Sequence, residues 1–298
     1  MSVVFFAGLP RSCTLGFADF FYQTIDAEGK RPLLTGHLHL AAVLSGQNLD
    51  QFDSPLNLYK SQEALIRCLL NLHGMDFSPD SFSSILKYYS SSSPGQINSQ
   101  RLKSSIEDSN LIVIDPSFSH SLNPSYFKEL PEIFVDLCLA VIWRNPIAFA
   151  LDIRIGVFAF DCCLHWIMAK KNLTFPLDPL ALWLEFVKPF SQKSCGLTSF
   201  SSQIYYLHAE SILQNKYAEM HGKFSFNDMS KIRESALAEI HPLVTDSPFS
   251  GDPSYCIESS MGNSMSVSVE QLALFSTNQS VIDEVAALSK AIGYVVVD

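Results

Sequence analysis

Basic residues are scarce in this chain. Lys and Arg together number 20 in 298 residues, against 30 Asp and Glu, so the formal net charge at pH 7 is −10. A negative field repels polyanions, which argues against nucleic acid as a partner and against heparin-like glycans as substrates. A small neutral or cationic molecule suits this charge better. With 47% hydrophobic and 17% charged residues, the chain can still bury a substantial core.

Cysteines with the spacing of a metal site or of a disulfide framework are also lacking. The seven cysteines are an odd number, and they include no Cys-x-x-Cys pair. We therefore expect no zinc or other metal, and we expect a reducing, cytoplasmic location.

The chain has no long uninterrupted hydrophobic run. Charged residues break its most apolar stretch, 132–168, and no basic segment precedes the apolar run at the N-terminus. Buried charges are costly in a bilayer, so we expect no membrane span and no ordinary signal peptide. The interrupting residues include Asp136, Arg144, Asp152, Arg154 and Asp161.

What the chain does have is an N-terminal strand–turn–helix pattern that can hold an anion. An apolar run ends at Gly8, and Arg11, Ser12 and Thr14 then open an amphipathic stretch. Unpaired backbone N–H groups and the positive helix end point into such a turn. Arg11 adds a charged fork, and the two hydroxyls add donors. The Walker A spacing is absent. The alternative is an ordinary turn with a surface arginine.

The string Gly8-Leu-Pro-Arg-Ser-Cys-Thr-Leu15 closely resembles the 5′-phosphosulfate loop of sulfotransferases that use 3′-phosphoadenylyl sulfate (PAPS). A common form of that loop is G-x-P-R-S-G-T-[TS], so Cys13 replaces the usual glycine. The resemblance implies a P-loop-like α/β sulfotransferase fold and PAPS as the donor, with no metal. It also implies cofactor-binding roles for Gly8, Pro10, Arg11, Ser12, Cys13, Thr14 and Leu15.

A second segment carries the same resemblance. Its two apolar strands end in Asp115-Pro-Ser and Arg144-Asn-Pro, where the family has K-[ST]-P and R-[DN]-P. In the family, that arginine and a serine eight residues later bind the 3′-phosphate, which implies this role for Arg144 and for position 152. Ligands of open α/β sheets bind beyond the carboxyl ends of strands. The alternative is an N-capping turn in which Arg144 forms an ion pair with Asp152 or Asp136.

The chain departs from the family at three places. Asp152 stands where the family has serine, and Asp115 stands where a lysine is frequent. The family also commonly supplies basic residues from a loop near the C-terminus, whereas this chain has no Lys or Arg from 234 to 289. A carboxylate beside a dianionic phosphate is unfavourable unless a cation lies between them. These departures favour a second hypothesis, a non-catalytic descendant that keeps the fold and binds a metabolite or partner.

Sulfuryl transfer needs a base that accepts the proton of the acceptor. The family takes it from a His or Glu near the second strand, and this chain offers His37 and His39 there. In an extended segment the two side chains share a face. We prefer His39, which lies further past the strand end; the alternative is that both are exposed or capping. Asp115 and His120 are reserve candidates.

Two features of the later part of the chain are expected to be structural, the Tyr–Glu pair within 205–210 and the aromatic residues Trp183 and Phe186. Tyr205-Tyr206-Leu-His-Ala-Glu210 resembles a late strand of the family, in which a tyrosine–glutamate pair precedes a helix, and the closing Gly293-Tyr294 also matches many members. We expect the pair to support the structure. Trp183 and Phe186 are expected to pack along a helix face, with an aromatic wall around the acceptor as the alternative.

Strand-like runs alternate with helical ones, which predicts a parallel sheet flanked by helices. We expect one α/β domain over 1–298, with a helical insertion at about 50–108 and a lid loop at 243–266. Predicted strands are 2–7, 32–36, 111–115, 138–143 and 203–208. Predicted helices are 14–25, 61–73, 79–89, 98–108, 122–130, 147–171, 178–190, 210–221, 228–240 and 279–292.

Together these features predict a sulfotransferase that moves a sulfuryl group from PAPS to a hydroxyl or amine of a small, neutral or cationic acceptor. In-line displacement at sulfur would parallel phosphoryl transfer. Arg11 would act on the developing charge of the leaving phosphate. A nucleotide-dependent kinase is a third hypothesis, and the missing Walker lysine argues against it.

Overall fold

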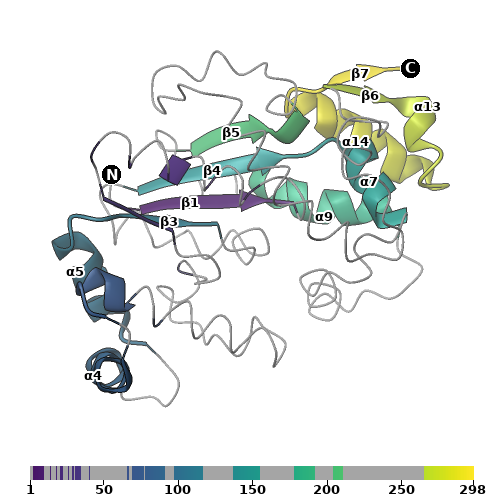
Figure 1. The fold of residues 1–298 in the computed structure, drawn as a ribbon. Coiled ribbons are helices and arrows are strands. Elements are labelled where there is room, and N and C mark those ends of the chain that lie inside the picture. The colour runs from purple at the N-terminus through teal and green to yellow at the C-terminus, as the bar shows by residue number, and fades with distance from the viewer. Residues whose placement is uncertain are drawn as a thin grey trace, which may run out of the picture. The chain divides into compact units, whose positions relative to one another are not determined.

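The computed structural model describes part of the chain, drawn as coloured ribbon in Figure 1. The backbone alone is described for Asp152 and Arg154. The described residues are 3–9, 14, 18, 21–22, 26, 29, 31–34, 40, 66, 69–76, 78–90, 97–116, 137–154, 178–191, 204–210 and 265–298.

Five strands form a parallel sheet in the order β2-β3-β1-β4-β5. They are β1 (Val3–Gly8), β2 (Pro32–Leu34), β3 (Ile112–Asp115), β4 (Leu137–Trp143) and β5 (Ile204–His208). The chain fills one side of β1 with β2 and β3, and then continues with β4 and β5 on the other side. The connections therefore diverge between β1 and β4, which is the place where open parallel sheets bind ligands.

The chain divides into two compact units. The first unit comprises Met1–Ala7, Phe21–Ala140 and Lys193–Tyr205, and the second comprises Gly8–Phe20, Val141–Gln192 and Tyr206–Asp298. The expectation of a single domain stays a prediction.

In the first unit, β1 is a continuous apolar strand because both of its faces are covered. Val3, Val4 and Phe5 are fully buried, and β3 pairs with β1 in the register Phe5↔Asp115. This unit also contains α4 (Pro79–Tyr89) and α5 (Ser99–Asp108), which lie within the predicted insertion. Both helices begin at side-chain caps: Ser78 accepts from the Ser81 amide, and Asn98 accepts from the Arg101 amide.

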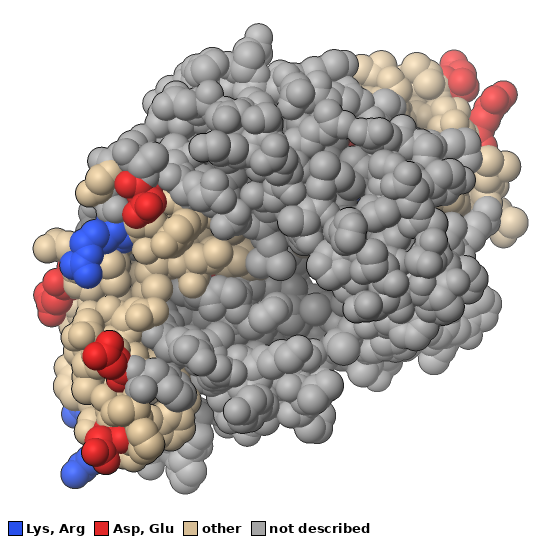
Figure 2. All heavy atoms as spheres, in the orientation of Figure 1, with Lys and Arg blue, Asp and Glu red and all other residues tan. Residues whose placement is uncertain are grey.

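Charged side chains of both signs are interspersed on the described surface. On the face shown in Figure 2, the described residues carry separate acidic and basic groups and form no continuous basic patch. One such pair lies along α5, where Lys103 Nζ is 3.9 Å from Glu107 Oε1. Exposed pairs of this kind contribute little to stability.

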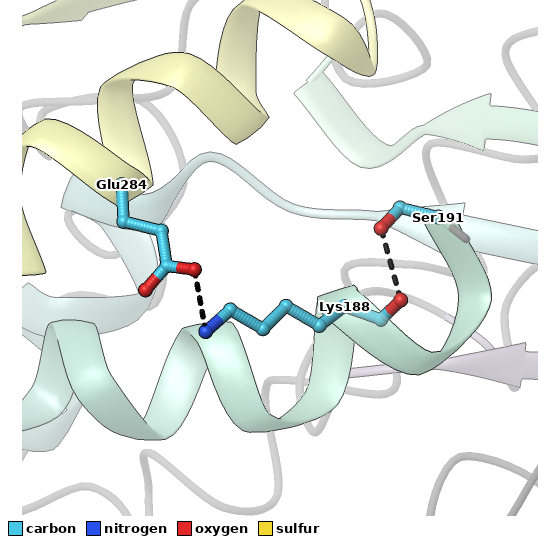
Figure 3. A network of polar contacts seen from close by, with 3 residues as sticks. All are labelled: Lys188, Ser191 and Glu284. Atoms are coloured by element: carbon cyan, nitrogen blue, oxygen red, sulfur yellow. Dashed lines mark hydrogen bonds and ion pairs between the residues drawn. The ribbon is translucent and has the colours of Figure 1, made fainter.

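The second unit contains α7 (Pro146–Arg154), α9 (Pro179–Ser191), β6 (Ser266–Ser268), α13 (Val269–Leu272), α14 (Gln279–Ala291) and β7 (Val295–Val297). Helix α9 packs against α7 and α14, and β6 pairs with β7 in parallel. Figure 3 shows the ion pair between α9 and α14, in which Lys188 Nζ lies 2.6 Å from Glu284 Oε1. The Ser191 hydroxyl donates to the Lys188 carbonyl at 2.9 Å in the last turn of α9.

The predicted α/β class and all five predicted strands are confirmed, with bounds within two residues. The helices predicted at 79–89, 98–108, 178–190 and 279–292 are confirmed to within one residue. The described residues within predicted helices 14–25 and 61–73 are helical up to Leu72, after which Gly74 has a φ of +62°. Helix α7 is described as far as Arg154, and the rest of 147–171 lies outside the described residues.

The sequence prediction missed β6, α13 and β7. Each has only three or four residues, and β6 contains a single apolar side chain, Val267. The prediction of a loop over 243–266 is wrong at its last residue, because Ser266 begins β6. Residues 243–264, the helices predicted at 122–130 and 228–240, and 211–221 lie outside the described residues.

Candidate functional site

The predicted phosphosulfate turn is described at its two ends. Gly8 is the last residue of β1, Leu9 is buried directly after it, and Thr14 is helical and half-buried. A strand therefore leads into the turn and helical backbone follows it, as the sequence predicts. Pro10, Arg11, Ser12, Cys13 and Leu15 lie outside the described residues, so their roles stay predictions.

Arg144 directly follows β4, the neighbour of β1 in the sheet. Its side chain is 6% exposed. Hydrogen-bonded strands lie about 4.8 Å apart, so the ends of β1 and β4 bring the backbone of Gly8 and of Arg144 to one edge of the sheet. Both strand ends, Gly8 and Val141–Trp143, belong to the second unit.

The peptide group that joins Arg144 to Asn145 is held on both sides. Its carbonyl oxygen accepts a hydrogen bond from Trp183 Nε1 at 2.9 Å, and its N–H donates to Glu210 Oε1 at 2.8 Å. Trp183 is fully buried and Glu210 is 1% exposed. Buried polar groups are costly when unpaired, so this double contact fixes the backbone at the start of the site.

Asn145 then starts α7. Its Oδ1 accepts from the Ile147 amide at 2.8 Å, its carbonyl accepts from the Phe149 amide at 3.0 Å, and Pro146 occupies the first helical position. Asn145 Nδ2 also donates to the Ser266 carbonyl at 2.9 Å, which ties β6 to the same turn. The N-capping turn weighed as an alternative is thus present, and Arg144 is the residue before the cap. The Asp152 side chain and Asp136 lie outside the described residues.

Glu210 links this turn to the C-terminal segment. Tyr294 Oη donates to Glu210 Oε2 at 2.9 Å, so each carboxylate oxygen has a donor. Burial raises the pKa of Glu210, while the amides of Asn145 and Glu210, the Arg144 charge and the Tyr294 hydroxyl oppose the shift. The supporting position expected for Glu210 is confirmed. Its hydroxyl donor is Tyr294, 84 residues along the chain, whereas Tyr206 stacks on Trp143 at 5.7 Å between ring centroids.

His208 lies beside the same tyrosine. Its Nε2 is 2.8 Å from the Ile292 carbonyl, which only accepts, so Nε2 carries the proton. The ring meets Tyr294 edge to face, with centroids 4.8 Å apart. Gly293 has a φ of +103°, and a Cβ there would lie 3.4 Å from the His208 ring. Burial lowers the pKa of His208, and the hydrogen bond to Ile292 only partly offsets this.

The lowered pKa of His208 gives a pH-dependent contribution to stability. The unfolded chain binds a proton at the usual histidine value of 6.5, and the folded chain binds it only at lower pH, so stability is lost as pH falls through this window. In urea denaturation, the difference in the free energy of unfolding between the unmodified chain and His208→Gln should therefore be smaller at about pH 5 than at about pH 8. An advantage that stays constant or grows towards acid would contradict this.

Asp115, a reserve candidate for the base, has a structural contact in the first unit. It ends β3 with no exposed surface, and its Oδ2 accepts a hydrogen bond from the Leu40 amide at 2.5 Å. Leu40 is buried, helical and directly follows His39. A buried carboxylate therefore holds the backbone next to His39, the preferred candidate for the base.

Substitution of Asp115 tests the contribution of its hydrogen bond with the Leu40 amide to stability. Asp115→Ala leaves the buried Leu40 amide unpaired and is expected to lower the free energy of unfolding by about 1–3 kcal/mol. Asp115→Asn keeps an oxygen acceptor and should lose clearly less. Urea denaturation of the two variants provides the comparison, and equal losses would show that the hydrogen bond to Leu40 is unimportant.

The predicted bases His37 and His39 and the reserve candidate His120 lie outside the described residues. The identity of the base therefore stays a prediction. Among the described residues, no group of three or more His, Cys, Asp or Glu is placed to hold a metal ion. None of the helices in the described part of the chain combines the length and apolar character needed to cross a bilayer.

No protein-family model matches the chain, and no curated protein matches it. Its structure is similar to two solved sulfotransferase domains. For the domain of the Synechococcus PCC 7002 olefin synthase, the identity is 13% and the TM-score 0.47, over 98% of this chain and 94% of that chain. For the domain from the curacin biosynthetic pathway, the values are 11% and 0.47, over 97% and 95%. At these values the likeness carries no inference about activity.

Proposed function

We propose that this protein is a sulfotransferase that transfers a sulfuryl group from PAPS to a hydroxyl or amine of a small, neutral or cationic acceptor. The observation that carries the proposal is the placement of Gly8 and Arg144 at the ends of two neighbouring strands. The helical Thr14 after the first strand end supports the anion-binding turn. The cysteine usage supports the cytoplasm as the site of the reaction.

Different residues would bind the two ends of the donor. Arg11, Ser12 and Thr14, with backbone amides of the turn, would bind the 5′-phosphosulfate, and Arg144 would bind the 3′-phosphate. The acceptor atom attacks sulfur with its lone pair while the bond from sulfur to the bridging phosphate oxygen breaks. Negative charge grows on the leaving phosphate, where Arg11 stabilises it. His39, or His37, takes the proton released by the acceptor.

The proposal is tested by a transfer assay. The intact chain is incubated with sulfur-labelled PAPS and a panel of small alcohols, phenols and amines, and labelled product is separated from donor. Transfer to at least one acceptor is expected, together with release of 3′-phosphoadenosine 5′-phosphate (PAP). Failure to bind PAPS at all would overturn the assignment. ATP with Mg²⁺ serves as the control donor for kinase chemistry and should give no product.

A non-catalytic nucleotide- or metabolite-binding protein is the second candidate. The buried Asp115 favours it, because a carboxylate that binds a backbone amide stands where the family often has a basic residue. The absence of Lys and Arg from 234 to 289 points the same way. Binding of PAP without transfer to any acceptor on the panel would favour this candidate, and measurable turnover would exclude it.

A further inference from the structure

The backbone of Arg144 is fixed by side chains from distant parts of the second unit. Trp183 comes from α9, and Glu210 follows β5, yet they bind the two polar groups of one peptide bond. Neither side chain has appreciable exposed surface. A peptide plane held by both its oxygen and its N–H cannot rotate without breaking a buried hydrogen bond, so the direction in which Arg144 leaves the backbone is set by these two contacts.

Glu210 is itself held in place. Tyr294 binds its second oxygen, and the ring of Tyr294 lies edge to face with His208, which binds the Ile292 carbonyl. The carboxylate is thus part of a buried hydrogen-bond network of Asn145, Glu210 and Tyr294, and the ring contact of Tyr294 with His208 adjoins it. Fully satisfied buried networks of this kind make a structure rigid.

We infer that Glu210 is a positioning residue for the nucleotide site: it holds the peptide after Arg144, and thereby fixes where the guanidinium meets the 3′-phosphate. This inference rests on the proposed function. It does not require Glu210 to touch the nucleotide. It assigns a specific task to a residue that the sequence indicates only as support, and it extends the site to Trp183 and Tyr294.

The chemistry of the contact predicts which substitutions matter. Glu210→Ala removes the acceptor of the Asn145 amide. Glu210→Gln keeps an oxygen for that amide and presents an NH₂ group to the hydroxyl of Tyr294, which can accept. Trp183→Phe keeps an aromatic ring but removes the donor to the Arg144 carbonyl. Glu210→Ala and Trp183→Phe should each remove one hydrogen bond of the peptide group after Arg144, and Glu210→Gln should keep both.

Calorimetric titration with two ligands makes the test. PAP carries the 3′-phosphate, and adenosine 5′-monophosphate (AMP) lacks it. Glu210→Ala and Trp183→Phe are each expected to weaken PAP at least about tenfold, corresponding to about 1.4 kcal/mol, and to change AMP less than about threefold. Glu210→Gln should stay within about threefold of the unmodified chain for both ligands. Glu284→Ala, which removes an exposed glutamate of the same unit, is the matched control and should change neither.

The outcomes separate the inference from the proposed function. Equal weakening of PAP and AMP would mean that Glu210 acts through general folding, and unchanged PAP affinity would mean that it does not act on the site; each overturns the inference alone. If Glu210→Ala fails to fold, Trp183→Phe decides the matter by the same criteria, because Trp183 binds the other polar group of the same peptide bond. If the unmodified chain binds no PAP, the proposed function fails and takes the inference with it.

Discussion

Arg11→Ala is expected to lower the rate of sulfuryl transfer about 100- to 1,000-fold. Arg11 stands three residues after the end of β1 and three before the helical Thr14, in the segment predicted to form an anion-binding turn. Its guanidinium would stabilise charge that develops on the leaving phosphate. Loss of one such donor typically lowers kcat about 100- to 1,000-fold. The donor assay described above measures it, with product quantified at saturating PAPS.

Arg101→Ala is the matched control for this change. Arg101 lies on α5 with its guanidinium 5.3 Å from the centre of the Tyr88 ring, and it belongs to the first unit. It has no proposed part in the reaction, so its removal should leave kcat within about twofold. Transfer that survives Arg11→Ala at the level of this control would contradict the placement of the phosphosulfate in the turn.

Arg144→Ala is expected to remove the discrimination between PAP and AMP. A charge-assisted, bidentate contact to phosphate is among the stronger protein interactions, and its loss should weaken PAP about 100-fold while AMP changes little. Arg144→Lys keeps the charge but loses the planar fork, and should fall between the two. The measurement is the ratio of the two dissociation constants for each variant.

Arg144→Ala should also change the pKa of Glu210. The Arg144 charge opposes the rise in the pKa of this carboxyl, so its removal should raise the pKa further and leave the carboxyl protonated over a wider pH range. Thermal unfolding of each variant must therefore accompany the titrations. If folded Arg144→Ala retains the original ratio of PAP to AMP affinity, Arg144 does not bind the 3′-phosphate.

Much of the fold could be predicted because its longer strands are continuous apolar runs in the sequence. A strand buried on both faces is a continuous apolar run, and Val3–Ala7 and Leu137–Trp143 have this form. The short elements β6, α13 and β7 could not be predicted in this way. Each depends on partners far along the chain, as the pairing of Val267 with Val296 shows.

Individual residues of the candidate site could be predicted from the sequence, but the contacts between them could not. Arg144 could be singled out because it ends an apolar strand and matches a family motif. The role of Glu210 could not, because its donors Asn145 and Tyr294 lie 65 and 84 residues away. Trp183 was correctly expected to pack in a helix, but its hydrogen bond to the Arg144 carbonyl depends on how α9 meets the end of β4. Only the packed structure brings these groups to one peptide bond.

In the proposed site, the turn after β1 and the arginine after β4 together bind a nucleotide phosphorylated at its 3′ and 5′ positions. Calorimetric titration of the intact, unmodified chain with PAP tests it most directly. We expect saturable binding of one PAP per chain that weakens as salt is added. The absence of both heat and a thermal shift at millimolar PAP would contradict it.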